Sequence, residues 1–314
     1  MNRYRVKLSF KTPIHIGYRE GAVDLTDTII HSDTIFSGII NCYALLYGNK
    51  KTKELADLFL KEEEETPFMV SSAFYYVDDE YLIARPFNFS LERYTEDIKE
   101  DIKKDKKVKY ISERVLFSKL EKLYIKGEFA FSKDIQKEIY KVEERPRVVV
   151  DRFTNATHIY YSSCSRFNEG CGLWFYLDVE DGIKHEIKSA IKLLADEGIG
   201  GERSYGYGQF DFSMEKIESR VENAKQYMLL SLCIPNERDD LEKLKAYGLI
   251  ERTGYISSPY LKSKRYMLHT MIKEGSILGD KFIGNVVDNT PSDFDIHRVI
   301  KYGKAFLIPL GLEV

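Results

Sequence analysis

The densest run of glycines lies at residues 198–208, where five of eleven residues are glycine. Glycine reaches positive φ angles and lets the backbone approach a ligand, and the N–H groups of such loops suit phosphate oxygens. Arg203 and Ser204 add a cation and a hydroxyl. The lysine of a P-loop is absent, and the loop precedes an expected strand rather than a helix, unlike a dinucleotide motif. The residues alone leave two interpretations open, a structural turn or a cradle for RNA phosphates.

Two histidines and an aspartate near the N-terminus could form a general acid–base set. They are His15, His31 and Asp33, and histidine is the usual proton carrier near neutral pH. The alternative is that His15 contacts RNA while His31 and Asp33 organise a helix, since the helix dipole favours a carboxylate in the first turn. The spacing of the six histidines matches no metal-ligand pattern. We therefore expect no metal site and no cofactor.

Two other stretches combine positive charge with aromatic rings. Residues 145–166 are expected to form a β-hairpin with a polar tip, and they carry four arginines against the single acid Asp151. Residues 260–266 place three cations between two tyrosines. Lysine and arginine neutralise phosphates, and tyrosine stacks on splayed bases. Either stretch alone is typical of a solvated charged face, but together with the glycine loop they predict an RNA-binding groove.

Length and composition limit the class of protein. The chain has 314 residues, 43% hydrophobic and 31% charged, which predicts about two packed domains rather than disorder. A net charge of −3 excludes a uniformly basic nucleic-acid coat but allows a local basic groove. Four widely spaced cysteines argue against a disulfide scaffold, and no apolar run is long enough to span a membrane. We expect a cytoplasmic protein without a membrane partner.

Hydrophobic periodicity indicates the elements that must position these residues. Residues 3–10 alternate apolar and basic side chains, as a strand with a basic outer face does. A helix follows, with Ser32 as its N-cap and Gly48 at its end. Residues 91–110 form a charged, solvated insert. We expect further helices at 50–66, 113–141 and 183–197, and strands at 68–76, 81–89, 147–150, 157–162, 173–179 and 206–212.

The order of these elements through residue 212 is β-α-β-β-α-β, the order of a ferredoxin-like fold. A weaker copy follows, with a helix at 239–246. The sequence therefore predicts an α+β protein of two tandem ferredoxin-like (RRM-like) domains, at 1–213 and 226–314. The first is enlarged by an insertion at about 50–145, and it carries the hairpin as a thumb.

The spacing of the glycine loop resembles that of a known family. Gly198-Ile199-Gly200 and Gly206-Tyr207-Gly208, five residues apart, resemble the signature loop of the RAMP superfamily of CRISPR RNA-binding proteins. In that family the loop follows the last helix of a ferredoxin-like domain. Three more stretches resemble family segments: Thr12–Gly17 after the first strand, Ile30–Ser37 at the first helix and Arg147–Ala156 in the hairpin.

The C-terminal part resembles one family within the superfamily. Arg252–Ile256, Lys273–Leu278 and Tyr302–Phe306 resemble segments of the fourth Csm subunits of type III-A CRISPR effector complexes. The resemblance implies a non-catalytic subunit in antiviral defence that caps crRNA at its 5′ tag. The implied partners are the crRNA, the large polymerase-like subunit and the backbone RAMP subunit of a Csm ribonucleoprotein. Residues 50–145 carry no such resemblance.

We expect the RNA contacts to come from loops and from the hairpin. These residues are His15, Gly17, Tyr18, Arg19, His31, Ser32, Arg147, Arg152, Phe153, Gly198, Gly200, Gly201, Arg203, Ser204, Tyr205, Gly206, Gly208, Lys264 and Arg265. An enzymatic alternative is a metal-independent CRISPR endoribonuclease of the RAMP superfamily that uses His15 or His31. A third possibility is a protein scaffold whose charged and aromatic surfaces face other subunits.

Overall fold

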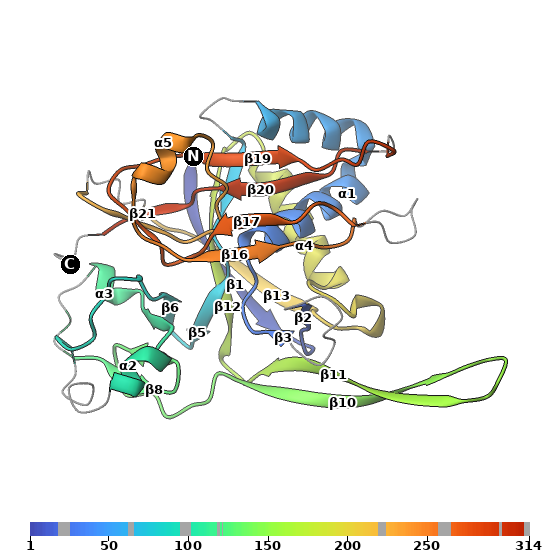
Figure 1. Cartoon of the computed structure of the whole chain (residues 1–314), viewed down its shortest axis with the longest axis horizontal. Coiled ribbons are helices and arrows are strands. Elements are labelled where there is room, and N and C mark those ends of the chain that lie inside the picture. The colour runs from blue at the N-terminus through green and yellow to red at the C-terminus, as the bar shows by residue number, and fades with distance from the viewer. Residues whose placement is uncertain are drawn as a thin grey trace.

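The largest sheet of the described structure is a mixed β-sheet (Figure 1). The computed structural model describes residues 1–17, 26–61, 66–94, 102–117, 120, 122–218, 224–256, 265–294 and 297–310. Across these ranges the sheet has nine strands in the order β13-β1-β12-β5-β6-β7-β9-β8, with β4 also paired to β12. The strands are β1 (Asn2–Phe10), β4 (Phe68–Val70), β5 (Phe74–Val77), β6 (Glu80–Ala84), β7 (Tyr110–Ser112), β8 (Tyr124–Lys126), β9 (Phe129–Phe131), β12 (Cys171–Val179) and β13 (Phe210–Lys216).

Strand β1 confirms the predicted alternation of apolar and basic side chains. Val6 and Leu8 are fully buried on one face, and β1 pairs antiparallel with both β12 and β13. The basic face is covered rather than free. Arg3 forms an ion pair with Asp178, and Arg5 lies over the ring of Tyr81. These cations therefore hold the sheet together and are not part of an open basic surface.

Two helices pack beside this sheet. They are α1 (Ser32–Leu60) and α4 (Lys184–Glu197). The predicted break at Gly48 is confirmed, because Gly48 has a φ of 79° and divides α1 into two segments. The predicted N-cap is wrong by one residue: His31 occupies the cap and Ser32 begins the helix. The central sheet uses β4 and β5 together with β1, β12 and β13, yet β4 and β5 lie within the insertion expected at about 50–145, so the predicted β-α-β-β-α-β order stays a prediction.

The predicted helices at 113–141 are mostly wrong. Only α3 (Arg114–Phe117) forms there among the described residues, and β8 and β9 follow it. The pairing of β9 with β7 is parallel, and it buries Ala130 and Phe131 in the core. Tertiary pairing therefore overrides the amphipathic pattern. The charged insert contains α2 (Ile102–Lys107), while residues 95–101 lie outside the described part.

The predicted hairpin is confirmed and is longer than expected. It consists of β10 (Tyr140–Val150) and β11 (Thr157–Phe167), in a register that pairs Arg145 with Ser162. Figure 1 shows it as an arm that extends away from the sheet. A short ribbon of β2 (Ile16–Gly17) and β3 (Thr26–Asp27) lies on the chain between β1 and α1.

The C-terminal half is built mainly from short strands. One sheet has the order β15-β18-β14-β21, and two ribbons pair β16 with β17 and β19 with β20. The described residues there contain one helix, α5 (Arg238–Glu242), shorter than the expected 239–246. The strands are β14 (Tyr227–Leu229), β15 (Leu244–Ala246), β16 (Leu249–Arg252), β17 (His269–Ile272), β18 (Ile277–Leu278), β19 (Gly284–Asp288), β20 (Ile300–Lys304) and β21 (Leu307–Pro309).

The two halves share a hydrophobic core. Tyr302 and Phe306 belong to the same buried cluster as Phe36, and the rings of Phe36 and Tyr302 stack with centroids 4.6 Å apart. The division into domains at 1–213 and 226–314 therefore stays a prediction. Among the described helices, none combines the length and the apolar character that crossing a bilayer requires.

Candidate nucleic-acid interface

Three segments that the sequence singled out meet at one place. They are residues 11–17, the proximal parts of the two hairpin strands (143–147 and 160–166) and the glycine loop 198–208, and we call their meeting point the loop junction. The N–H of Gly201 donates to the carbonyl of His15 at 2.8 Å, and the N–H of Gly208 donates to that of Pro13 at 2.8 Å. Backbone bonds between Ile14 and Ser165 attach the hairpin to the same segment. Residues far apart in sequence thus form one surface.

The glycines of the loop are required by close backbone contacts. Gly208 has a φ of 79°, and a Cβ atom there would lie 2.1 Å from the carbonyl oxygen of Ile199. Gly198, which ends α4 with a φ of 86°, would place a Cβ 2.4 Å from the carbonyl oxygen of Tyr207. A Cβ on Gly200 would meet the carbonyl of His15 at 2.5 Å. These glycines therefore let the loop fold on itself and against residues 11–17.

The exposed part of the loop is one turn of 3₁₀-helix, η2 (Arg203–Tyr205). Its three residues are exposed, and Glu202 and Gly206 flank it in the left-handed conformation. The N–H groups of Gly198, Gly201, Gly206 and Gly208 already donate to protein carbonyls. The side chains of η2, rather than these amides, are therefore the groups offered to a ligand, which corrects the expectation of an amide cradle at those four glycines.

The side chain of Arg147 connects the hairpin to the glycine loop. It forms an ion pair with Glu202, and its guanidinium lies over the rings of Tyr205 and Tyr207, 4.3 and 5.8 Å from their centroids. Burial disfavours the charged form, but hydrogen bonding to Tyr207 and the charge of Glu202 outweigh burial and raise the pKa of Arg147 above its ordinary value. The guanidinium of Arg145 also lies over the ring of Tyr207, 5.7 Å from its centroid.

Residues 11–17 place one expected contact inside the junction and one at its surface. His15 is 8% exposed, and its Nδ1 lies 2.7 Å from the carbonyl oxygen of Ser163. Gly17 is exposed in β2. Tyr18 and Arg19 lie outside the described residues.

The tip of the hairpin, residues 151–156, carries two expected contacts. The carboxylate of Asp151 accepts the N–H groups of Phe153 and Thr154 at 2.7 and 3.0 Å, which holds the turn and lowers the pKa of Asp151. Phe153 is 98% exposed, and Arg152 is exposed beside it.

The second basic stretch is described only at its end. Lys264 lies outside the described residues. Arg265 donates to the hydroxyl of Tyr255 at 3.1 Å and lies over its ring at 5.1 Å.

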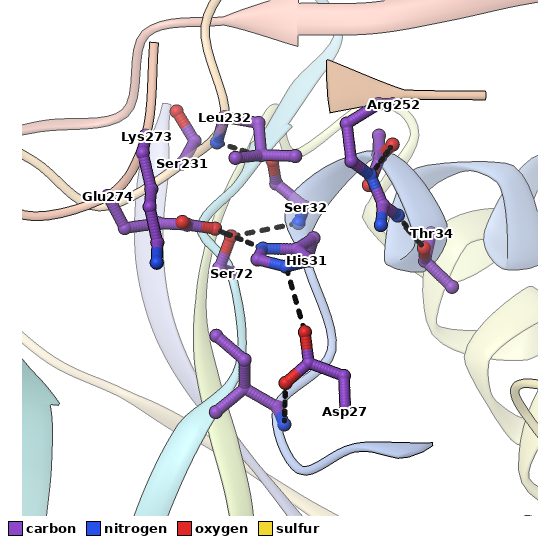
Figure 2. A network of polar contacts seen from close by, with 12 residues as sticks. Asp27, His31, Ser32, Thr34, Ser72, Ser231, Leu232, Arg252, Lys273 and Glu274 are labelled. Atoms are coloured by element: carbon purple, nitrogen blue, oxygen red, sulfur yellow. Dashed lines mark hydrogen bonds and ion pairs between the residues drawn. The ribbon is translucent and has the colours of Figure 1, made fainter. Parts of the chain in front are cut away.

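Two expected RNA contacts, His31 and Ser32, are buried. Figure 2 shows the polar network around them. His31 is 1% exposed, with Nδ1 2.6 Å from Glu274 and Nε2 3.3 Å from Asp27. Burial disfavours its charged ring, but the two carboxylates outweigh burial and raise the pKa of His31 to about 9. The hydroxyl of Ser32 accepts the N–H of Leu232 at 2.9 Å. Both residues join α1 to the C-terminal half, so we no longer expect either to contact RNA.

Asp33 completes this buried network. Arg252 donates to both of its carboxylate oxygens at 3.0 Å, and the ammonium group of Lys301 lies 2.5 Å from one of them. Burial opposes ionisation, but the two cations hold the pKa of Asp33 far below its usual range. Asp33 therefore organises the start of α1, as the alternative interpretation expected. Sequence reasoning missed both partners, since Arg252 lies 219 residues away.

Comparison with known proteins places the chain in a family. The model of the RAMP superfamily matches residues 7–211, more than half of the chain. The chain belongs to the RAMP superfamily. Residues 222–310 match a second model, the CRISPR Csm4 C-terminal domain.

Two curated relatives of this RAMP protein share one name with each other. A protein of Methanocaldococcus jannaschii, "CRISPR system Cms protein Csm4", is 28% identical over 98% of this chain and 96% of its own length. A protein of that name from Thermococcus onnurineus is 27% identical over 91% of this chain and 92% of its own. The predicted resemblance to the fourth Csm subunits is thereby confirmed.

Solved structures share the fold. A chain of the Csm3-Csm4 subcomplex of the type III-A CRISPR-Cas interference complex has a TM-score of 0.69 at 22% identity, covering 99% of this chain and 100% of that one. A chain of the Csm1-Csm4 cassette in complex with pppApA has a TM-score of 0.64 at 22% identity, with 99% of each chain covered.

The loop junction and the partners of the buried network fall in different matched regions. The RAMP match contains all three segments of the loop junction. The Csm4-type C-terminal match contains Arg252, Glu274 and Lys301, which hold the start of α1. Among the described residues, no group of histidine, cysteine, aspartate or glutamate side chains could hold a metal ion.

Proposed function

We propose that this RAMP protein is a non-catalytic, crRNA-binding subunit of a cytoplasmic type III-A Csm complex, and that it caps the 5′ tag of the crRNA at the loop junction. The observation that carries the proposal is the exposure of Arg203, Ser204 and Tyr205 on one short turn where the three RAMP segments meet. A cation, a hydroxyl and a ring so placed can contact phosphate and base of the same strand.

The partners follow from the relatives. Proteins named Csm4 match almost the whole chain, and the similar solved structures are complexes that pair Csm4 with Csm3 or with Csm1. We therefore propose that the chain contacts the backbone RAMP subunit and the large polymerase-like subunit. The net charge of −3 favours a local RNA site over a uniformly basic surface.

The proposed contacts differ in kind. Arg152, Arg203, Lys264 and Arg265 supply positive charge, Phe153 and Tyr205 supply rings for bases, and Ser204 supplies a hydroxyl on the same turn as Arg203. Gly17 is exposed in β2, and Tyr18 and Arg19, which follow it in the sequence, are proposed contacts as well. His15 has its side chain turned to the hairpin and takes part through its backbone and position. The glycines at 198, 200, 201, 206 and 208 act by shaping the loop.

Replacement of Arg203 tests the proposal. Arg203→Ala should weaken binding of a repeat-derived single-stranded RNA in filter binding and reduce the slope of log K against log salt by about one, because one phosphate contact is lost. Lys192→Ala is the matched control, since it removes an equal charge from an exposed position on α4. Equal affinity and equal salt slope for wild type and Arg203→Ala would contradict the proposal.

The two alternatives make different demands. An endoribonuclease would need His15 or His31 to reach RNA, yet both side chains are buried and engaged. Incubation of the purified chain with repeat RNA in EDTA checks this directly, and a discrete cut abolished by His15→Ala or His31→Ala would revive the enzyme. A pure scaffold would give no gel shift of crRNA and no crosslink to it within the complex.

A further inference from the structure

Arginine and tyrosine side chains alternate across the boundary between the hairpin and the glycine loop. Arg145 lies 5.7 Å from the ring centroid of Tyr207, and Arg147 lies 5.8 Å from the same centroid. Arg147 then lies 4.3 Å from the centroid of Tyr205. The four side chains form a ladder in the order Arg145, Tyr207, Arg147, Tyr205, with contacts at cation–π distances.

The two tyrosines of the ladder differ in exposure. Tyr207 is buried inside it, whereas Tyr205 at its outer end is 68% exposed. Arg147 covers one face of the Tyr205 ring, so the exposed surface belongs to the rest of the ring. A buried aromatic needs no further partner, but a ring held rigidly at a surface with an open face is a stacking platform.

The local backbone keeps this ring in place. Tyr205 ends a turn that begins after Glu202, a non-glycine residue with a φ of 60°, and closes at Gly206 with a φ of 80°. A left-handed conformation is costly for a residue with a side chain and persists only where its surroundings fix it. Here the ion pair of Glu202 with Arg147 fixes it. The same carboxylate therefore shapes the turn and holds the guanidinium against the ring.

We propose that Tyr205 is the stacking site for one unpaired base of the bound RNA, and that Arg147 and Glu202 are positioning residues that act through its ring. This inference rests on the proposed function. It assigns Arg147 a different role from Arg203, because the guanidinium of Arg147 is already neutralised by Glu202 and packed between two rings. Arg203, two residues before Tyr205 on the same exposed turn, is the group for an adjacent phosphate.

Fluorescence of a base analogue separates stacking from simple binding. A single-stranded RNA with the repeat-derived 5′ sequence carries a fluorescent adenine analogue at successive positions, and each RNA is titrated with the full chain. Stacking on a tyrosine ring should quench one position. Tyr205→Ala should abolish that quenching and weaken affinity by about tenfold, while Tyr205→Phe should retain both. Tyr247→Ala, at another tyrosine that is 55% exposed, is the control and should change neither.

The outcomes distinguish the inference from the function on which it rests. If wild type binds none of the RNAs, the proposed function fails. If wild type binds but no position is quenched, or if quenching survives in Tyr205→Ala, the stacking site is wrong and RNA binding stands. Glu202→Gln tests the positioning role of Glu202. Removing a negative charge should not weaken RNA binding, but losing the ion pair with Arg147 should reduce the quenching at the position that wild type quenches. Quenching equal to that of wild type would refute the role of Glu202.

Discussion

Replacement of His31 should remove a specific pH dependence from the stability of the protein. The ring of His31 lies between Glu274 at 2.6 Å and Asp27 at 3.3 Å and is almost fully buried. Burial alone would favour the neutral ring, but these carboxylates outweigh it and raise the pKa of His31 from 6.5 to about 9. The folded state therefore binds a proton that the unfolded chain releases near neutral pH.

The size and direction of the effect follow from this pKa. A difference between 6.5 and about 9 corresponds to roughly 3 kcal/mol of folding free energy, as an order of magnitude. Because the folded pKa lies above the unfolded value, the contribution is complete below pH 6.5 and is lost as the pH rises to about 9. Burial also raises the pKa of Glu113, from 4.5 to about 7, despite the nearby Arg5. The stability linked to Glu113 is therefore lost as the pH rises from 4.5 to about 7, mostly below the pH window of His31.

Urea unfolding at several pH values between 6.5 and 9 measures this loss. Wild type should lose free energy of unfolding across the window, and His31→Gln should lose little because glutamine does not titrate there. His185→Gln, at an exposed histidine on α4, is the matched control and should keep the slope of wild type. A wild-type free energy that stays constant across the window would refute the reasoning even if His31→Gln failed to fold, and so would an unchanged slope in that variant.

Two further predictions concern the buried network and the glycine loop. Asp33→Asn removes the carboxylate that pairs with the partly buried Arg252 and the buried Lys301, and it should lower the free energy of unfolding by about 3–5 kcal/mol in urea titration. Asp57→Asn, in the surface pair with Arg298, should cost less than about 1 kcal/mol. Equal losses would contradict the assigned network. Gly208→Ala should cost more stability and more RNA affinity than Gly206→Ala, since both glycines have positive φ but a Cβ meets Ile199 only at Gly208. Comparable urea midpoints for the two variants would argue against the close backbone contact.

Much of the fold could be predicted because local patterns and tertiary packing agree. The alternation in β1 and the glycine that breaks α1 each signal a local structure that the core then uses. The helices expected at 113–141 failed for the opposite reason. Phe129 and Phe131 have spacing that also suits a strand, and the parallel neighbour that stabilises β9 comes from β7. Only the assembled sheet decides between the two periods.

In the candidate site too, local features could be predicted from the sequence, whereas contacts between distant segments could not. Spacing identified the glycine loop and the hairpin, because their glycines and turn residues carry the conformational constraint in themselves. Residue type could not separate Arg147, neutralised by Glu202, from the exposed Arg203. Nor could it show that His31 is buried beside a carboxylate 243 residues away. Charge pairing between distant segments leaves no periodic signal in a single sequence.

The buried network gives the C-terminal half an indirect part in shaping the loop junction. Glu274, Arg252 and Lys301 hold the first turn of α1. Further along α1, Gly38 lets α4 approach so closely that a Cβ there would lie 3.0 Å from the side chain of Leu194. The carbonyl of Leu194 accepts the N–H of Gly198 at 2.9 Å, which ends α4 and starts the glycine loop. These contacts connect the start of α1, through Gly38 and Leu194, to the residue at which the glycine loop begins.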